Sequence, residues 1–200
     1  TRTVYYVENE EIVCLSNEHT RFCNIDGEPL EKQPVTIDWD IHAAEKGGYE
    51  HFMLKEIHEQ PKAVRDTISP RIHENEIDLG EIGMTDEEIK NLRKISIVAC
   101  GSAYHTGAAG KYVIEELARI PVETDLASEF RYRNPIYQEN SLVIIVSQSG
   151  ETADSLAALR DAKAHGCKVL SIVNVVGSSI ARESDDVLYT WAGPEIAVAT

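Results

Sequence analysis

The second half of the chain alternates between apolar runs and amphipathic stretches from about residue 84 onward. Thr85-Asp86-Glu87-Glu88 reads as a capping box and predicts a helix that runs to about Arg93. Two longer stretches, 103–118 and 152–164, also predict helices. The apolar runs predict strands at residues 95–99, 122–126, 142–146, 168–173 and 187–189. Because buried strands alternate with helices, the pattern predicts an α/β fold with a doubly wound, five-stranded parallel sheet.

The first forty residues instead show short alternating runs separated by turn residues. We expect strands at 3–7, 11–15 and 20–25, the last of which ends at the Asp26-Gly27 turn. Short strands joined in this way favour an antiparallel meander. Since two or three strands are barely stable alone, this opening suggests a piece cut from a larger domain.

A connector is expected between the two patterns, at residues 34–51. Beyond it, Met53, Leu54 and Ile57 predict a helix over 51–60 with one buried face. Pro61 is expected in a turn or at the first position of a second helix at 61–69.

Composition narrows the function classes. The formal net charge of −15 argues against a nucleic-acid surface, which needs basic residues to neutralise phosphates. The four cysteines show no C-x-x-C spacing, so reduced thiols are expected. With neither a signal peptide nor an apolar run of membrane-spanning length, the sequence predicts a cytoplasmic protein that binds no membrane.

Histidines at positions 42, 51, 58 and 73 raise the question of a metal. Their spacing matches no compact ligand pattern. We expect neither a metal site nor a cofactor.

The loops that follow the predicted strands should carry the chemistry, because ligands of open parallel sheets bind beyond the carboxyl ends of the strands. Cys100-Gly101-Ser102-Ala103 follows the first of them. Its small residues let the backbone approach a ligand at a helix start. It is not the G-x-G-x-x-G dinucleotide motif, and no P-loop is present.

The strongest candidate is Ser147-Gln148-Ser149-Gly150-Glu151-Thr152, which follows the third strand. Three hydroxyls and an amide surround a helix start there, and the partial positive charge of that helix end suits a phosphate. Helix capping alone needs one such residue, so the cluster favours ligand binding. Glu151 is assigned to the helix dipole and to the orientation of neighbouring backbone. Residues 174–179, after the fourth strand, read equally well as a simple turn and cap.

The segment Ser147 to Asp154 resembles the hallmark of sugar isomerase (SIS) domains, as does Gly193 to Thr200. More narrowly, residues 46–57 and 127–132 resemble the family of glutamine–fructose-6-phosphate aminotransferases. The resemblance covers essentially the whole chain and implies the flavodoxin-like strand order. It implies three segments: the end of a glutaminase domain (1–40), a linker with connector helices (41–83) and the first SIS domain (84–200).

This resemblance implies the conversion of fructose 6-phosphate and glutamine to glucosamine 6-phosphate and glutamate, the first step of hexosamine biosynthesis. It implies sugar-phosphate contacts at Cys100, Gly101, Ser102, Ser147, Gln148, Ser149, Thr152, Val198 and Thr200. The sequence departs from the family pattern at Ala103, where a hydroxyl is lost, and at Thr200, where one is kept. A homodimer through the SIS domains is also implied.

The family's catalytic groups lie outside the segments that this chain resembles. We therefore expect no catalytic residue in it and no turnover by the chain alone, which a measured aminotransferase activity would contradict. The alternatives are a non-catalytic SIS sensor of sugar phosphates and a nucleotide-binding Rossmann domain. A sensor would carry a basic helix-turn-helix in its first third, and a Rossmann domain would carry the glycine motif.

Overall fold

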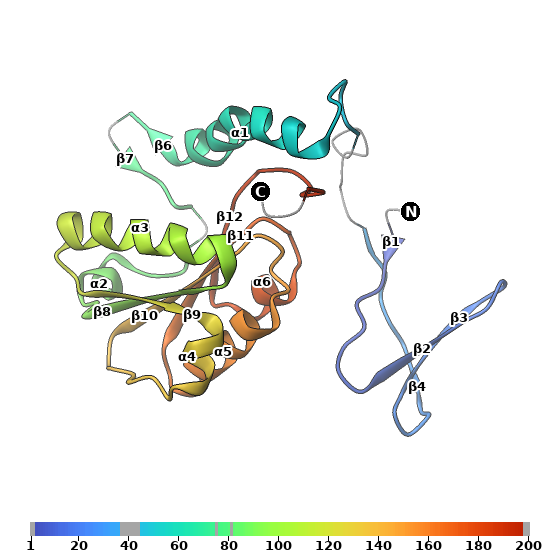
Figure 1. Cartoon of the computed structure of the whole chain (residues 1–200). Helices are drawn as coiled ribbons and strands as arrows, with labels where there is room; N and C mark the ends of the chain where they lie inside the picture. The colour runs from blue at the N-terminus through green and yellow to red at the C-terminus, as the bar shows by residue number, and fades with distance from the viewer. Residues whose placement is uncertain (1–2, 37–44, 75, 81, 198–200) are drawn as a thin grey trace. The chain divides into compact units, whose positions relative to one another are not determined.

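The computed structural model describes residues 3–36, 45–74, 76–80 and 82–197. The chain divides into two compact units, Thr1–Glu45 and Lys46–Thr200. Figure 1 labels most of their helices and strands. Each unit is described by itself.

The first unit is built from short antiparallel strands (Figure 1). Strands β2 (Glu11–Leu15), β3 (Thr20–Asn24) and β4 (Pro29–Leu30) form a meander in that order. Strand β1 (Thr3–Val4) pairs with β5 (Val35–Thr36) in a separate ladder.

The meander was predicted, but the expected strand 3–7 is wrong in length and in partner. Only Thr3–Val4 enters a ladder, and that ladder is formed with β5. Tyr5 instead packs its ring on Phe22 of β3, with the ring centroids 5.1 Å apart. An alternating pattern marks an extended, half-buried backbone, yet it does not say which edge that backbone joins.

The second unit begins with one long helix, α1 (Phe52–Ile68), which contains Pro61. The expected break at Pro61 is therefore wrong. The helix continues through Pro61 even though proline has no N–H for a helical hydrogen bond. The buried face expected from Met53, Leu54 and Ile57 is also wrong, because these side chains are 40%, 42% and 50% exposed. A 3-10 turn, η2 (Ser69–Arg71), and a small ladder of β6 (Ile72–His73) and β7 (Glu76–Ile77) follow.

A five-stranded parallel sheet forms the centre of this unit, in the order β12-β11-β10-β8-β9. Its strands are β8 (Lys94–Ala99), β9 (Val122–Leu126), β10 (Ser141–Ser147), β11 (Lys168–Val173) and β12 (Asp186–Tyr189). Numbered along the chain, the order is 2-1-3-4-5, which is the flavodoxin-like arrangement. The predicted fold class is confirmed.

Helices cover both faces of the sheet (Figure 1). They are α2 (Asp86–Lys90), α3 (Gly101–Ala118), α4 (Ala127–Tyr132), α5 (Ala153–Ala164) and α6 (Ser179–Glu183). Val143 and Ile145 of β10 pack with residues of α4, α5 and α6. Leu142 and Ile144 point to the other face, where α3 and the segment around α2 pack. The alternation along β10 thus builds two cores.

The capping box predicted at Thr85 is confirmed, with Thr85 and Glu88 exchanging hydrogen bonds at the start of α2. This helix ends at Lys90 rather than near Arg93. Helix α4, within residues 127–132, was not predicted. Six residues between a strand and a loop carry too little periodicity to reveal a helix.

Candidate functional site

A small cleft lies at the carboxyl ends of β8 and β10, with a cavity volume of about 150 Å³. These strands are neighbours in the sheet, but the chain leaves them in opposite directions, toward β9 and toward β11. Such a switch in strand order leaves a crevice, because the two following connections diverge. The cleft is lined by Cys100, Ser102, Ala103, Val146, Ser147, Gln148, Ser149, Thr152 and Glu195.

The structure brings most of the predicted site residues together here. Six of the nine predicted positions line the cleft: Cys100, Ser102, Ser147, Gln148, Ser149 and Thr152. Gly101 stands at the start of α3, with φ of +56°, and is not part of the lining. Val198 and Thr200 lie outside the described residues.

The loop from Ser147 to Thr152 is held by its own hydroxyls. Ser147 is 4% exposed, and its Oγ accepts a hydrogen bond of 3.0 Å from the Gly150 N–H. The Thr152 hydroxyl lies 3.3 Å from the same Oγ. The exposed Ser149 accepts 3.2 Å from the Glu151 N–H. The loop is therefore pre-formed, with Ser147 as its internal support and Ser149 at its surface.

Gly150 allows this loop to rest on the start of α6. Its φ is +66°, and an added Cβ would lie 2.0 Å from Ser178 Oγ. The Gly150 carbonyl accepts a hydrogen bond of 3.0 Å from the Ile180 N–H. Only glycine combines this conformation with so close an approach.

Glu151 turns away from the start of α5 and binds α6 instead. Its Oε1 accepts a hydrogen bond of 2.7 Å from the Ser179 N–H, at the first residue of α6. From the sequence, we expected Glu151 to interact with a helix dipole and with neighbouring backbone. In the structure, the helix that it contacts is α6.

The two strand-end loops also meet each other. Cys100 is the N-cap residue of α3, and its Sγ accepts a hydrogen bond of 3.8 Å from Ser155 in the first turn of α5. Helices α3 and α5 therefore both begin at the cleft, so both direct their N-terminal N–H groups toward this end of the sheet.

The electrostatics of the lining are those of neutral donors. The described lining residues include no Lys or Arg, and Glu195 is their one acidic side chain. Hydroxyls, an amide and helix N-termini suit an anion of moderate size without a full positive charge. Among the described residues, no group of three His, Cys, Asp or Glu side chains is arranged to hold a metal ion.

Sequence reasoning missed Glu195 and Val146 as lining residues, and it used Ala103 only as a departure from a pattern. Glu195 lies in the segment that follows β12, and its place after a strand was a usable signal. Asn174, for which the sequence left a turn and a ligand contact open, orders that segment: its Oδ1 accepts a hydrogen bond of 2.9 Å from the Ala192 N–H.

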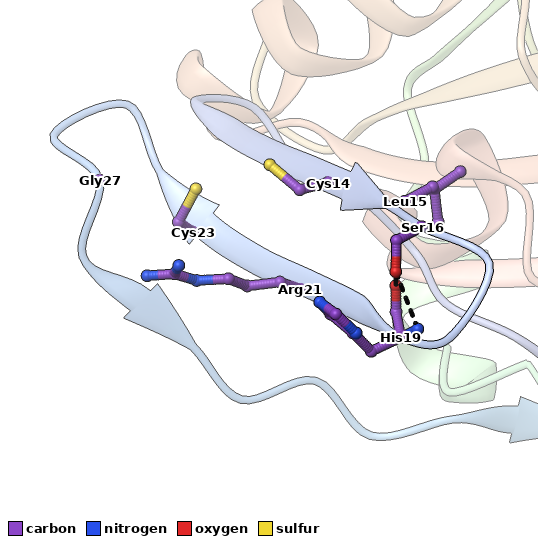
Figure 2. A pocket seen from close by; sticks show the side chains of 7 residues that line it. All are labelled: Cys14, Leu15, Ser16, His19, Arg21, Cys23 and Gly27. Carbon is purple, nitrogen blue, oxygen red and sulfur yellow. Dashed lines mark hydrogen bonds between the residues drawn. The ribbon is translucent and has the colours of Figure 1, made fainter.

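A larger hollow of about 410 Å³ lies in the first unit, along the β2–β3 hairpin (Figure 2). Its walls come from the β2–β3 hairpin, including Cys14 and Arg21, and from Gly27 in the turn between β3 and β4. Ser16 Oγ donates to the His19 carbonyl and accepts from the His19 N–H, both at 3.0 Å. These bonds close the hairpin turn, so the polar groups serve the turn itself.

All four cysteines are free thiols. No helix within the described ranges has the length and apolar character needed to cross a bilayer.

Comparison with known proteins identifies the family of the chain. A family model described as "SIS domain" matches residues 88–200, which is more than half of the chain. The chain is 61% identical over its whole length to the glutamine–fructose-6-phosphate aminotransferase [isomerizing] of Clostridium acetobutylicum, of which it covers 33%. It is 57% identical to the enzyme of that name from Caldanaerobacter subterraneus subsp. tengcongensis, again covering 33%.

Among solved structures, the C-terminal domain of the glucosamine-fructose-6-phosphate aminotransferase of Francisella tularensis matches with a TM-score of 0.69 and 43% identity. That match covers 78% of this chain and 44% of the other. The chain thus spans about a third of the length of the curated relatives it matches.

Proposed function

The chain belongs to the SIS domain family, and we propose that its cleft binds the phosphate end of a sugar phosphate. One observation carries the proposal. Ser147, Ser149 and Thr152 gather around the start of α5 at the switch in strand order, and Ser102 at the start of α3 lines the same cleft. A phosphate has several acceptor oxygens, and hydroxyls with helix N–H groups supply donors for them.

The volume of the cleft indicates that the described residues form only part of the ligand-binding site. About 150 Å³ is below the range of roughly 300–1,000 Å³ typical of pockets that enclose a drug-sized ligand. The described residues therefore surround one end of the ligand. Glu195 accepts hydrogen bonds, so it suits the hydroxyls of a sugar better than a phosphate.

We further propose that the chain works as part of a glutamine–fructose-6-phosphate aminotransferase, an activity named in its relatives. The reaction would convert fructose 6-phosphate and glutamine to glucosamine 6-phosphate and glutamate. On this proposal, the sugar phosphate binds at the positions predicted from the sequence, including Val198 and Thr200.

Homodimerisation through the SIS domain and a cytoplasmic location belong to the same proposal. The domain boundaries after residues 40 and 83 also stay predictions. No observation in the described ranges favours the sensor alternative.

A titration tests the binding. The ¹⁵N-labelled chain is mixed with glucosamine 6-phosphate or, as the control, with glucosamine, and amide resonances are followed. We expect shifts confined to residues 100–103, 147–152 and their immediate neighbours, with the phosphate compound only. An unchanged spectrum at millimolar glucosamine 6-phosphate would contradict the proposal.

A further inference from the structure

The segment that follows β12 forms part of the cleft, because Glu195 lies in its lining. Burial does little to hold this segment. Residues 191–196 are exposed, and the large side chains of Trp191 and Ile196 are 51% and 42% exposed. Hydrogen bonds to its backbone hold it instead.

Those bonds come from two directions. On one side, Asn174 accepts from the Ala192 N–H at 2.9 Å and donates to the Gly193 carbonyl at 2.6 Å. The other partners lie on α1 and the turn after it, more than a hundred residues earlier in the chain. Thr67 Oγ1 accepts from the Trp191 N–H at 2.9 Å, and Arg71 donates at 3.0 Å to the carbonyl of Tyr189, the last residue of β12.

Glu56 makes the contact nearest to the cleft. Its Oε1 accepts hydrogen bonds from the N–H groups of Ile196 at 2.9 Å and Ala197 at 3.0 Å. Both donors directly follow Glu195. A carboxylate that accepts from backbone N–H groups forms charge-assisted bonds, which are about twice as strong as neutral ones.

We propose that Glu56 is a positioning residue for the sugar-phosphate site. It fixes residues 196–197 and so holds Glu195 in the wall of the cleft. The role in binding rests on the proposed function, whereas the contact itself does not. The consequence is that α1, outside the sheet, controls the affinity of a cleft whose described hydroxyls come from the loops after β8 and β10.

The test uses the full chain with Glu56→Ala and Glu56→Gln, and Asp66→Ala as the matched control. Asp66 is an acidic residue of the same helix, and it pairs with Lys62. Two quantities are measured: the amide resonances of Ile196 and Ala197 without ligand, and the dissociation constant for glucosamine 6-phosphate.

For Glu56→Ala we expect upfield movement of both amide resonances, with those of residues 147–152 unchanged. We expect affinity to fall about tenfold, as loss of a charge-assisted bond implies. The amide oxygen of Glu56→Gln still accepts hydrogen bonds, so most of the affinity should return. Asp66→Ala should behave as wild type. A merely structural role would not give this residue-specific shift together with rescue by glutamine.

Glu56→Ala with wild-type affinity and unmoved resonances would overturn the inference alone. A wild-type chain that binds no glucosamine 6-phosphate would overturn the proposed function, and the role of Glu56 in binding with it. If Glu56→Ala fails to fold, Glu56→Gln decides, because a neutral acceptor should weaken binding about two- to threefold. If Glu56→Gln has the affinity of wild type and the same amide resonances at Ile196 and Ala197, the inference is wrong.

Discussion

At the scale of single residues, the cleft depends on one backbone conformation that a side chain would destroy. Gly150 combines a φ of +66° with contact to Ser178, and both its N–H and its carbonyl are bonded. The loop that carries the hydroxyls is therefore held in place by the start of α6. Its geometry does not depend on a ligand.

Gly150→Ala is expected to destabilise the chain by about 3 kcal/mol, from conformational strain and overpacking together. Urea denaturation gives the measurement. Two controls separate the causes. Gly166→Ala has a positive φ but no neighbour within 4 Å, so it should show strain alone. Gly110 lies within α3 and has neither a positive φ nor a neighbour within 4 Å, so Gly110→Ala should be neutral or slightly stabilising. Equal losses at positions 150 and 166 would refute the contact with Ser178.

The two serines of the loop should separate support from binding. Ser147→Ala leaves the buried Gly150 N–H without its acceptor, which costs about 1–2 kcal/mol of stability, and it also weakens binding of glucosamine 6-phosphate. Ser149→Ala, at an exposed position, should weaken binding while stability changes by less than about 0.5 kcal/mol. Denaturation and titration of both variants provide the comparison. A stability loss at Ser149 equal to that at Ser147 would show that both serines support the loop.

At the scale of elements, local signals in the sequence were reliable and long-range partners were not. The capping box at Thr85 was found because both of its members lie within four residues. Pro61 is the exception among the local signals: it was expected to end a helix, but α1 runs through it from Phe52 to Ile68. Strand β1 was misread because its partner, β5, lies some thirty residues away in the sequence.

The cap of α2 provides a test at this scale. Thr85→Ala removes the acceptor of the Glu88 N–H, so we expect a loss of about 1 kcal/mol in unfolding free energy, measured with urea. Thr85→Ser keeps the hydroxyl and should lie within a few tenths of a kcal/mol of wild type. If serine and alanine are equally costly at this position, the loss has another origin than the cap.

At the scale of the whole molecule, two carboxylates tie α5, α6 and β11 together and should make stability depend on acid. The Arg160 guanidinium forms two hydrogen bonds of 2.7 Å with Glu183 and lowers the pKa of that carboxyl. Burial raises the pKa of Asp185, but hydrogen bonds from Lys163 and the Val169 N–H outweigh it, and the pKa is lowered overall. Both groups bind protons less readily in the folded chain than in the unfolded chain.

A lowered pKa in the folded state means that the stabilisation is complete above the unfolded pKa, roughly 4, and is lost as the pH falls further. The stabilisation that these two carboxylates give wild type should therefore be lost below about pH 4. Glu183→Gln should be less stable at pH 7 by about 0.5 kcal/mol, since the pair is largely exposed, and its acid limb should be shallower. Thermal unfolding between pH 3 and pH 7 checks this. Parallel curves for the two proteins would exclude Glu183 as a source of the acid dependence.

The sequence also set a limit on how much of the site could be predicted. The hydroxyl loop was predictable because Ser147, Ser149 and Thr152 are contiguous and follow a continuously apolar strand. The role of Glu56 was not predictable, because its partners lie 140 and 141 residues away in the sequence. A glutamate on a helix surface is also too common to mark a functional residue. Residues such as Asn174 act on backbone groups, and a backbone contact leaves no matching side chain to recognise.

The separation between Glu56 and Ile196 has a consequence for synthesis on the ribosome. Helix α1 emerges first, and the segment that it holds follows 140 residues later. At about 10 residues per second, this delay is on the order of ten seconds. During that time the hydroxyl loop can already form on β10, whereas Glu56 cannot yet accept hydrogen bonds from Ile196 and Ala197. We expect this wall of the cleft to close only after the hydroxyl loop has formed.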